Sequence, residues 1–529
     1  MSGALELSPR TEDFTTWRPR VNPWLIALSV VLATFMEVLD TTIVMVALPH
    51  IAGSMAATQS EATWTLTSYL VANGIVVPTT AWLALRFGRK RLIMACTVLF
   101  VASSMACGLA PNLAVLVVAR IFQGLGGGAM VPATQAVLLE SFPPAQRGMA
   151  MALFGVVVVL APIIGPTFGG WLTDNYSWRW TFFINLPVGL TSLVLMAYFL
   201  EDPPWIQKAK AGKLDSWGLA LLAIWVGALQ IVLDKGQDED WFASPFITRL
   251  SVIMAVALAA FVVRELRTRE PVVDLRVFGN RNFWTATVTV ALVSWVMYSS
   301  STLLPQFLQT LMGYNAEWSG WAISPRGFGV MLAMPLAGYL SSLIDGRKIV
   351  VVGLTLLAWS NHLLSNLTLE VGISNLALAN FVQGVAMGLV FVPLTTLAVA
   401  TLRNEQMGNA TGLFNLVRNI GGSVGISVMV TYLVRRAQAH QALLVSHLTP
   451  YDVPYQQRLQ FFQWALSRIS QLPQAIEQAH AAVYMILLQQ AALKAYVDVY
   501  RFLALAVFVC VPTVLLMRRT VTRGLPGFH

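Results

Sequence analysis

Long apolar segments alternate with short charged or turn-forming stretches along almost the whole chain. A transmembrane helix needs about 20 mainly apolar residues to cross a hydrocarbon core of roughly 30 Å. Fourteen runs of this kind can be identified, so the pattern predicts an all-α integral membrane protein with fourteen transmembrane helices. The predicted spans cover residues 24–47, 62–85, 92–110, 113–136, 148–170, 180–199, 217–233, 246–263, 283–308, 318–343, 350–367, 376–400, 410–433 and 497–516.

The composition supports lipid as the solvent around these helices. Of the 529 residues, 56% are hydrophobic and only 11% are charged, a balance that a soluble globular surface would not tolerate. The polar start of the chain is unlike a cleavable signal peptide, and the first apolar run is long enough to span the membrane. Cys96, Cys107 and Cys510 all fall inside predicted spans, so no disulfide, metal site or cofactor is expected.

The formal net charge of +9 marks topology, because the basic residues gather in short loops instead of on one face of a soluble domain. A nucleic-acid partner is therefore not expected. Placing the first residues in the cytoplasm puts every basic cluster inside, and an even number of spans returns both termini to the cytoplasmic side of a bacterial inner membrane. The inside clusters are Arg18/Arg20, 86–91, 208–213, 264–270, 346–348 and Arg518/Arg519, and the outside loops, nearly free of Lys and Arg, are 50–61, 110–112, 234–240, 312–318 and 370–375.

Two short patterns occur in both halves of the chain, which points to a duplicated bundle of six helices. The basic turn at 87–90 recurs at 345–348, and Ile-Phe-Gln-Gly at 121–124 recurs as Phe-Val-Gln-Gly at 381–384. The two spans between the halves then join them. The predicted division is a cytoplasmic tail at 1–23, a six-helix bundle at 24–200, two linking helices at 201–281, a second six-helix bundle at 282–517 and a cytoplasmic tail at 518–529.

One long polar segment, residues 434–494, interrupts the second bundle on the predicted periplasmic side. Connections of this length are commonly functional or disordered. Apolar residues recur at helical spacing over 455–469 and 475–487, which predicts two amphipathic helices. We expect these helices to lie on the membrane surface or to bind a partner.

The first predicted span carries two acids, Glu37 and Asp40, one turn apart on one face. At about 1.5 Å per residue, Glu37 lies roughly 20 Å into the membrane. Burial and a neighbouring like charge both disfavour the ionised form of a carboxyl, so this pair can bind and release one proton. The alternative is a permanently neutral acid that is hydrogen-bonded to a neighbouring helix. The proton-coupling site is predicted at Asp40, with Glu37 as a second candidate.

Three arginines, Arg120, Arg326 and Arg418, fall at membrane depth, where a guanidinium needs a partner. Arg120 is expected to neutralise an acid of the first span, or to hold a hydrogen-bond network that changes as the proton moves. Snorkelling to the cytoplasmic face is the alternative for Arg120 and Arg418. Arg326 has no match in the first half and stands between Pro325 and Gly327, so it is predicted to face an anionic substrate.

Other polar, aromatic and helix-breaking residues complete the predicted site. The span at 148–170 holds a run of prolines and glycines that permits a kink and close helix contact. The aromatic stretch 174–187 that follows is interpreted as an anchor at the outer membrane interface. The prolines and glycines are Pro162, Gly165, Pro166, Gly169 and Gly170, and the residues predicted to line a poorly selective substrate cavity are Trp64, Asn73, Gln123, Phe154, Tyr298, Gln306 and Asn415, together with Arg326 and Arg418.

Five motifs carry a family resemblance that covers nearly the whole chain. They are LDTTIVMVALP at 39–49, RIFQG at 120–124, APIIGPTFGG at 161–170, WRWTFFINLPVG at 178–189 and NLVRNIGGSVG at 415–425. Taken together, they resemble the fourteen-helix drug:proton antiporter family of the major facilitator superfamily, in its EmrB type.

The resemblance implies the major facilitator fold, with two six-helix bundles around a central cavity plus two linking helices. It further implies alternating access that exchanges external protons for internal toxic compounds, with Asp40 and Arg120 taking part in proton coupling. A periplasmic adaptor protein and an outer-membrane channel are implied as partners. The chain departs from the superfamily pattern at Ala81 and Leu85, where glycine and aspartate are usual, so a charge relay in the following loop is not expected.

These observations favour a secondary active transporter, not an enzyme: a proton-driven exporter of small amphipathic or weakly acidic molecules, acting as the inner-membrane part of a tripartite efflux pump. The alternative is a facilitator or proton symporter for an organic acid, which the same fold would serve. An ATP-driven pump is disfavoured because the glycine-rich stretch 124–128 lacks the Lys-Ser/Thr of a P-loop. A membrane-embedded enzyme or receptor is disfavoured because 434–494 carries no catalytic cluster.

Overall fold

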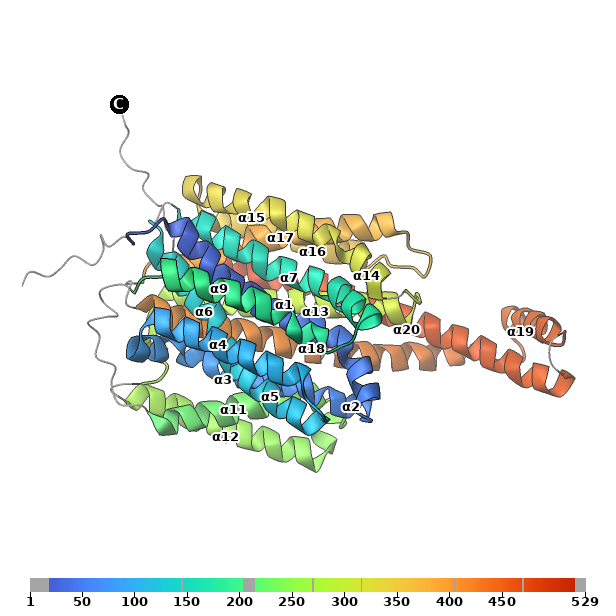
Figure 1. The fold of residues 1–529 in the computed structure, drawn as a ribbon. Helices are drawn as coiled ribbons and strands as arrows, with labels where there is room; N and C mark the ends of the chain where they lie inside the picture. Colours follow the sequence, from blue (N-terminus) through green and yellow to red (C-terminus); the bar gives the residue numbers. More distant parts are fainter. Residues whose placement is uncertain are drawn as a thin grey trace, which may run out of the picture.

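A computed structural model describes residues 19–143, 146–202, 215–268, 271–314, 316–402, 406–468 and 471–518. Every regular element within these residues is a helix, so the predicted all-α class is confirmed (Figure 1). The predicted basic cluster at 208–213 and most of both terminal tails lie outside the described residues. The elements are α1 (Pro23–Ser54), α2 (Gln59–Ala62), α3 (Trp64–Phe87), α4 (Arg89–Gly108), α5 (Leu113–Gly127), α6 (Met130–Ser141), α7 (Arg147–Asn175), α8 (Trp180–Phe183), α9 (Asn185–Phe199), α11 (Ser216–Lys235), η2 (Trp241–Ala243), α12 (Pro245–Arg267), η3 (Leu275–Gly279), α13 (Arg281–Thr310), α14 (Ala316–Ile323), α15 (Pro325–Leu343), α16 (Gly346–Leu364), α17 (Ile373–Val399), α18 (Met407–Val445), α19 (Val453–Leu466) and α20 (Leu472–Leu515).

Each predicted span has a helical counterpart in this set. Eleven helical segments of the described chain are long and apolar enough to cross a membrane. The helix α7, the pair α14–α15 and the helix α16 lie alongside them in the bundle and match the three remaining predicted spans (Figure 1). The prediction of fourteen membrane-spanning segments therefore agrees with the fold.

Three of these segments consist of two helices each, and the sequence explains the breaks. Gly128 and Ala129 separate α5 from α6 after two glycines that end α5, because glycine is a poor helix former. Pro187 lacks the N–H that would bond to Phe183, so α8 and α9 are separate elements. Pro325 likewise divides α14 from α15 at Ser324.

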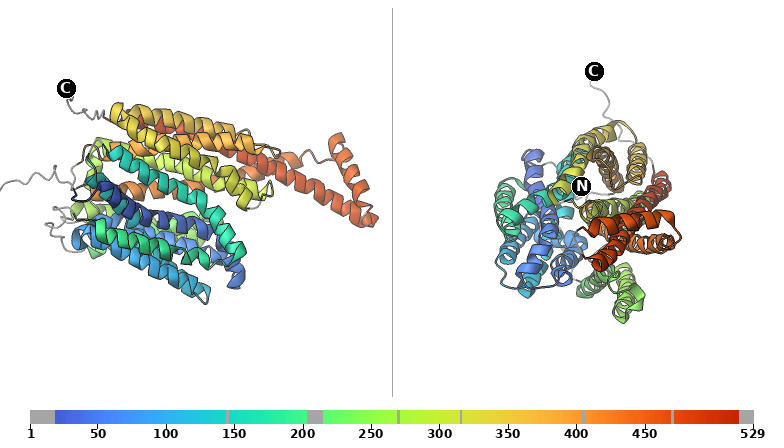
Figure 2. Two further views of the ribbon diagram at one scale, coloured as in Figure 1. Left: turned by 45° about the horizontal axis from the view of Figure 1, so that its top comes forward. Right: turned by 90° about the vertical axis from the view of Figure 1, so that its right-hand side faces the viewer.

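The helices form two groups that meet along the length of the bundle. In Figure 2, right, α1–α9 (blue to cyan) lie on one side and α13–α20 (yellow to red) on the other, with α11 and α12 at the edge. The helix α7 contacts α15 so closely that a Cβ on Gly148 would lie 2.8 Å from Gly338 O. Asn415 Nδ2 donates to Gln135 Oε1 at 2.5 Å across the same boundary. These contacts join the halves near the end of the bundle where the described chain starts and stops, which we term the termini end.

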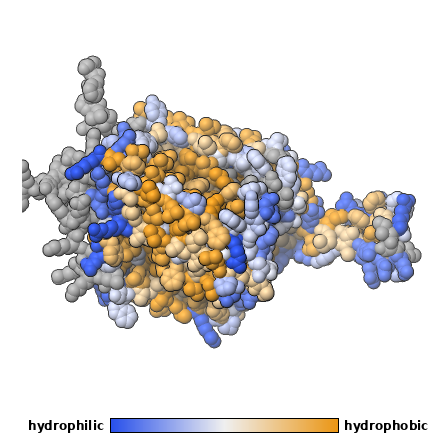
Figure 3. Space-filling model, in the orientation of Figure 1, coloured by the Kyte–Doolittle hydropathy of each residue, from blue (hydrophilic) through white to orange (hydrophobic). Residues whose placement is uncertain are grey.

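A belt of apolar side chains surrounds the middle of the bundle. Figure 3 shows this hydrophobic band between two hydrophilic ends. Large side chains near the middle of the outer helices face outward, as on Val256 of α12 and Leu332 of α15, which are 64% and 65% exposed. Exposure of such a large apolar surface to water is unfavourable, whereas a lipid hydrocarbon core would solvate it.

The polar segment at 434–494 is built differently from the prediction. The helix α18 continues without interruption to Val445, and α20 begins at Leu472 and runs unbroken into the last span. The helix predicted at 455–469 is confirmed as α19, but the one predicted at 475–487 is part of α20. The prolines at 454 and 473 do not break these helices, because each stands in a first turn where no N–H is needed.

Together, the outer part of α18, the helix α19 and the outer part of α20 form an arm that projects from the bundle away from the termini end (Figure 1). In this structure they do not lie across the end of the bundle. Leu459 of α19 packs against Ala479 and Val483 of α20 in a small apolar cluster. At the base of the arm, Arg436 and His440 of α18 both bind the carboxylate of Asp498 on α20.

Candidate functional site

Asp40, near the middle of α1, is fully buried and accepts hydrogen bonds from three side chains. Arg120 Nη1 lies 2.5 Å from Asp40 Oδ2. Gln123 Nε2 and Asn185 Nδ2 lie 2.8 and 2.7 Å from Asp40 Oδ1. Because Arg120 and Gln123 belong to α5 and Asn185 to α9, one carboxylate connects three helices. Both carboxylate oxygens thus accept hydrogen bonds, which is the pattern expected for an ionised carboxylate, because it has no proton to donate.

Arg120 is also fully buried, and its other contacts fix the guanidinium. Nε donates to Thr65 O at 3.0 Å, and Nη1 donates to Gln123 Oε1 at 2.8 Å. The Tyr69 ring lies 4.2 Å from Cζ, which is cation–π distance. Nη2 has no hydrogen-bond partner among the described residues. Arg120 thus does not snorkel in this structure. Its Nη2 group could donate a hydrogen bond if the side chain changed partners.

Glu37, one turn before Asp40, has its own set of partners. The Tyr69 hydroxyl and Asn73 Nδ2 both donate to Glu37 Oε1 at 3.0 Å. Only 7% of Glu37 is exposed. Since the same Tyr69 stacks on Arg120, the two acids of α1 are linked through one tyrosine of α3.

The glycines of α7 bring this helix against α1 directly beyond Asp40. A Cβ on Gly165 would collide with the hydroxyl of Thr42, and one on Gly169 would lie 3.0 Å from Ile43 Cγ2. A Cβ on Gly170 would meet its nearest atom, Val46 Cγ1, at an ordinary 3.8 Å. Close helix contact is therefore confirmed at Gly165 and Gly169. The neighbouring Pro162 is exposed, the side chain of Pro166 lies outside the described set, and α7 stays one continuous helix.

The second half buries two arginines without an acid hydrogen-bonded to either, among the described residues. Arg326 Nη1 donates to Ser301 Oγ at 2.6 Å and Nη2 donates to Asn380 Oδ1 at 2.9 Å. Arg418 lies over the Phe391 ring, with Cζ 5.6 Å from the centroid. Arg418 is only 7% exposed, so it does not snorkel in this structure either.

Comparison with known proteins agrees with this architecture. Residues 30–426 match the family model described as Major Facilitator Superfamily. The chain belongs to this superfamily. It is 40% identical over 430 residues to the multidrug export protein EmrB of Haemophilus influenzae, covering 81% of this chain and 84% of that protein. It is also 40% identical to the fatty acid resistance protein FarB of Neisseria gonorrhoeae over 427 residues, with the same two coverages.

Two further comparisons extend the match. The multidrug export protein EmrB of Escherichia coli K12 is 38% identical over 433 residues, which are 81% of this chain and 83% of that protein. The crystal structure of the human organic anion transporter MFSD10 matches with a TM-score of 0.58 at 13% identity, over 92% of this chain and all of that one. The predicted fold and the predicted EmrB-type membership of the superfamily are thereby confirmed, and the chain is a multi-pass membrane transporter, not an enzyme.

Some of the residues predicted to line the substrate cavity lie together at the two acids of α1, and others lie elsewhere in the structure. Asn73 and Gln123 bind the two acids of α1. Phe154 is fully buried in the core, and the side chain of Asn415 is hydrogen-bonded to Gln135 across the boundary between the halves. Other predicted residues are more open: Tyr298 and Gln306 are exposed on α13, and Trp64 stands at the start of α3 with its ring 5.8 Å from Lys235 Nζ.

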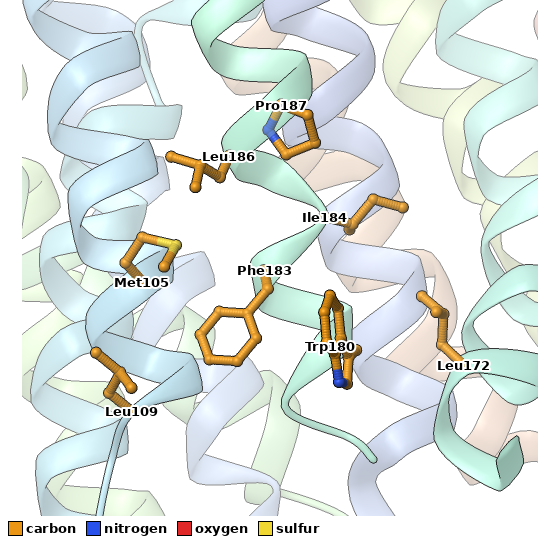
Figure 4. Close-up of a pocket in the computed structure, with 8 residues that line it drawn as sticks. All are labelled: Met105, Leu109, Leu172, Trp180, Phe183, Ile184, Leu186 and Pro187. Atoms are coloured by element: carbon orange, nitrogen blue, oxygen red, sulfur yellow. The ribbon is translucent and has the colours of Figure 1, made fainter. Parts of the chain in front are cut away.

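A separate apolar pocket of about 530 Å³ lies between α4, α7 and the α8–α9 pair (Figure 4). No predicted cavity residue lines it. Its walls contain only hydrophobic side chains: Met105, Leu109, Leu172, Trp180, Phe183, Ile184, Leu186 and Pro187.

Two polar contacts were not predicted from the sequence. Asn185 was interpreted as part of an aromatic anchor, yet its amide binds Asp40 and the hydroxyl of Ser104. An amide directly after an aromatic run, inside an apolar span, was the available signal. At the termini end, Arg89 forms a buried ion pair with Glu140 of α6. That pair was not predicted because Arg89 belongs to a basic turn and Glu140 lies beyond the predicted span 113–136, so neither residue stood out as buried.

Proposed function

We propose that this transporter is a proton-driven exporter of small amphipathic molecules. The observation that carries the proposal is the fully buried ion pair between Asp40 and Arg120, at a depth where an ionisable pair is costly and is usually functional. The names of the relatives support export of small molecules, because two are multidrug export proteins and one is a fatty acid resistance protein.

Protonation of Asp40 supplies the switch. A protonated carboxyl no longer balances Arg120, and an uncompensated guanidinium in a buried site is strongly unfavourable. Arg120 then moves toward other partners, with its free Nη2 available, and the contact between α1 and α5 loosens. External protons thereby favour one arrangement of the bundles, and release of the proton inside favours the other.

A continuous set of close contacts runs from Asp40 to the boundary between the halves. The helix α7 packs on α1 at Gly165 and on α15 of the other half at Gly148. Both contacts are too tight to adjust gradually, so a shift of α1 is passed to α15 as a movement of α7.

The proposal predicts proton flux coupled to substrate. In proteoliposomes with an internal pH-sensitive dye, an outward gradient of a fluorescent amphiphile should drive protons in the opposite direction. A protonophore should abolish uphill accumulation of the amphiphile. Substrate movement with no accompanying pH change would contradict the proposal and favour a facilitator.

A proton symporter for an organic acid is the second candidate, and Arg326 favours it, because a buried cation suits an anionic cargo. The direction of the imposed gradient separates the candidates. An exporter accumulates substrate on the acidic side of the membrane, whereas a proton symporter accumulates it on the alkaline side.

We further propose that the termini end faces the cytoplasm and that the arm meets a periplasmic adaptor protein of a tripartite pump. The support is the basic character of the loops at the termini end and the projection of the arm from the opposite end. Leu459→Asp places a charge in the apolar contact between α19 and α20 and should separate the two helices. This variant should leave transport in proteoliposomes intact and lower the drug resistance of cells. Equal loss in both assays would instead indicate damage to the carrier itself.

A further inference from the structure

The second half repeats the hydrogen-bond frame of the Asp40 cluster with different side chains. In the first half, Arg120 of α5 donates to the carbonyl of Thr65 at the start of α3. In the second half, Asn380 of α17 donates to the carbonyl of Ala322 in α14 at 3.3 Å. Arg120 and Asn380 both precede the repeated Gln-Gly sequence by the same number of residues. Asn380 therefore occupies the place of Arg120.

The glycine of the repeated sequence fixes a second pair of equivalent places. A Cβ on Gly124 would collide with the carbonyl of Tyr69, and a Cβ on Gly384 would collide with the carbonyl of Arg326. Arg326 thus stands where the first half has Tyr69. The first half therefore has no arginine at the place of Arg326, and the equivalent residue there is a tyrosine.

The third equivalence concerns the acid. Gln123 Nε2 donates to Asp40 Oδ1 at 2.8 Å, and its counterpart Gln383 Nε2 donates to Ser300 Oγ at 2.9 Å. A neutral hydroxyl on α13 therefore occupies the place of the carboxylate on α1. Gln383 and Ser300 are fully buried, as are Gln123 and Asp40.

The two sites therefore share a backbone frame but differ in charge. The first half holds a guanidinium and a carboxylate, whereas the second holds the guanidinium of Arg326 and, within the described residues, no acid in contact with it. Arg326 is only 4% exposed, and its Nε has no hydrogen-bond partner in the part of the chain that the structure describes. A buried cation of this kind is unfavourable unless an anion reaches it.

We propose that Arg326 binds the carboxylate of an exported amphipathic anion, which supplies the negative charge that Asp40 supplies in the first half. This proposal rests on the proposed export function and names its cargo class: a carboxylate head group on an apolar body. The planar guanidinium matches a carboxylate in shape. Tyr298, which is 40% exposed, stands on the same face of α13 as Ser301, the Arg326 partner, and offers the apolar body a ring.

The break between α14 and α15 provides a way to the site. Ser324 separates the two helices, and Arg326 follows two residues later. In this proposal, a movement of α14 relative to α15 at this break exposes the guanidinium while both helices stay intact. An inorganic anion would share the same charge, so the test has to separate a carboxylate amphiphile from chloride.

Equilibrium binding to the purified full-length protein in nanodiscs, without any pH gradient, tests the proposal. The probes are 4-butylbenzoate, 4-butylbenzylammonium and sodium chloride. Arg326→Gln should raise the Kd of 4-butylbenzoate about ten- to a hundredfold, the loss expected for hydrogen bonds between charged groups. The Kd of 4-butylbenzylammonium should not change, and Arg249→Gln, which removes an exposed arginine on α12, should change neither.

A second variant keeps the test valid if Arg326→Gln folds poorly. Ser300→Asp places a carboxylate where the first half has Asp40, so it should neutralise Arg326 internally and weaken 4-butylbenzoate binding to a similar extent. Unchanged 4-butylbenzoate binding in both variants would overturn the proposal. So would full displacement of 4-butylbenzoate by chloride, which would indicate an inorganic anion site. Asp40→Asn should still bind 4-butylbenzoate, so a failure of proton coupling and a failure of this proposal give different results.

Discussion

Asp40→Asn is expected to reduce gradient-driven export to the level of empty liposomes. Asparagine keeps the size of the side chain and can still bind Gln123 and Asn185, but it cannot exchange a proton. Arg120 would lose its counter-charge in a fully buried site, so the variant should also be less stable, by about 3–5 kcal/mol. Transport is measured in proteoliposomes with an imposed pH gradient, and stability by thermal unfolding in detergent.

A double variant separates these two effects. Asp40→Asn combined with Arg120→Gln removes both charges, and such replacement of a whole buried pair is much less destabilising than removal of one member. The double variant should therefore regain thermal stability while gradient-driven export stays absent. Glu37→Gln serves as the matched control on the same helix, and it should retain coupled export at a reduced rate. Persistent coupled export in Asp40→Asn would show that the proton site lies elsewhere.

Gly165→Val is expected to block transport and to lower thermal stability. The first added carbon collides with the Thr42 hydroxyl of α1, and a branched side chain cannot turn away within a continuous helix. Overpacking of this kind usually costs about 1–3 kcal/mol. Because the collision lies next to Asp40, the displaced helices would also lose the alignment of the proton site. Purified yield, thermal unfolding and export should all fall together.

The control for this prediction is Gly170→Ala, where the added Cβ would make only an ordinary contact with Val46. It should behave as the wild type in all three measurements. The smaller change Gly165→Ala adds only the first of these carbons. Replacing Thr42 with glycine removes the atoms nearest to that carbon and should partly rescue Gly165→Ala. Wild-type export by Gly165→Val would mean that α7 and α1 do not need to stay in close contact during the cycle.

The number of spans and the pairing of Arg120 with an acid of the first span could be predicted, because burial in a membrane leaves few explanations for such residues. Which of the two acids it binds could not be predicted, and the structure shows Asp40. An apolar run of sufficient length has to be a helix in lipid, and a charged side chain within it needs a polar partner. Gln123 was also identified, but as a cavity residue. Its contact with Asp40 depends on the angle between α5 and α1, which the sequence does not specify.

Other features depended on three-dimensional contacts without a sequence signature. The equivalence of Tyr69 and Arg326 is carried by backbone carbonyls, so comparison of side-chain types hides it. Asn185 stands among aromatic residues that suggested an interface anchor. The arm was expected as separate surface helices because its polar composition ends the hydrophobic signal of α18 and α20, although helix geometry simply continues.

The length of α20 has a mechanical consequence. Its 44 residues form one unbroken helix of about 66 Å that belongs to the second half at one end and to the arm at the other. The Arg436–Asp498 ion pair and the His440–Asp498 hydrogen bond tie it to α18, so the arm cannot pivot freely at its base. When the second half tilts, α20 therefore acts as a lever, and the tip of the arm travels farther than any residue near Asp40. A spectroscopic label on α19 would record each turnover of the carrier as a swing of the arm.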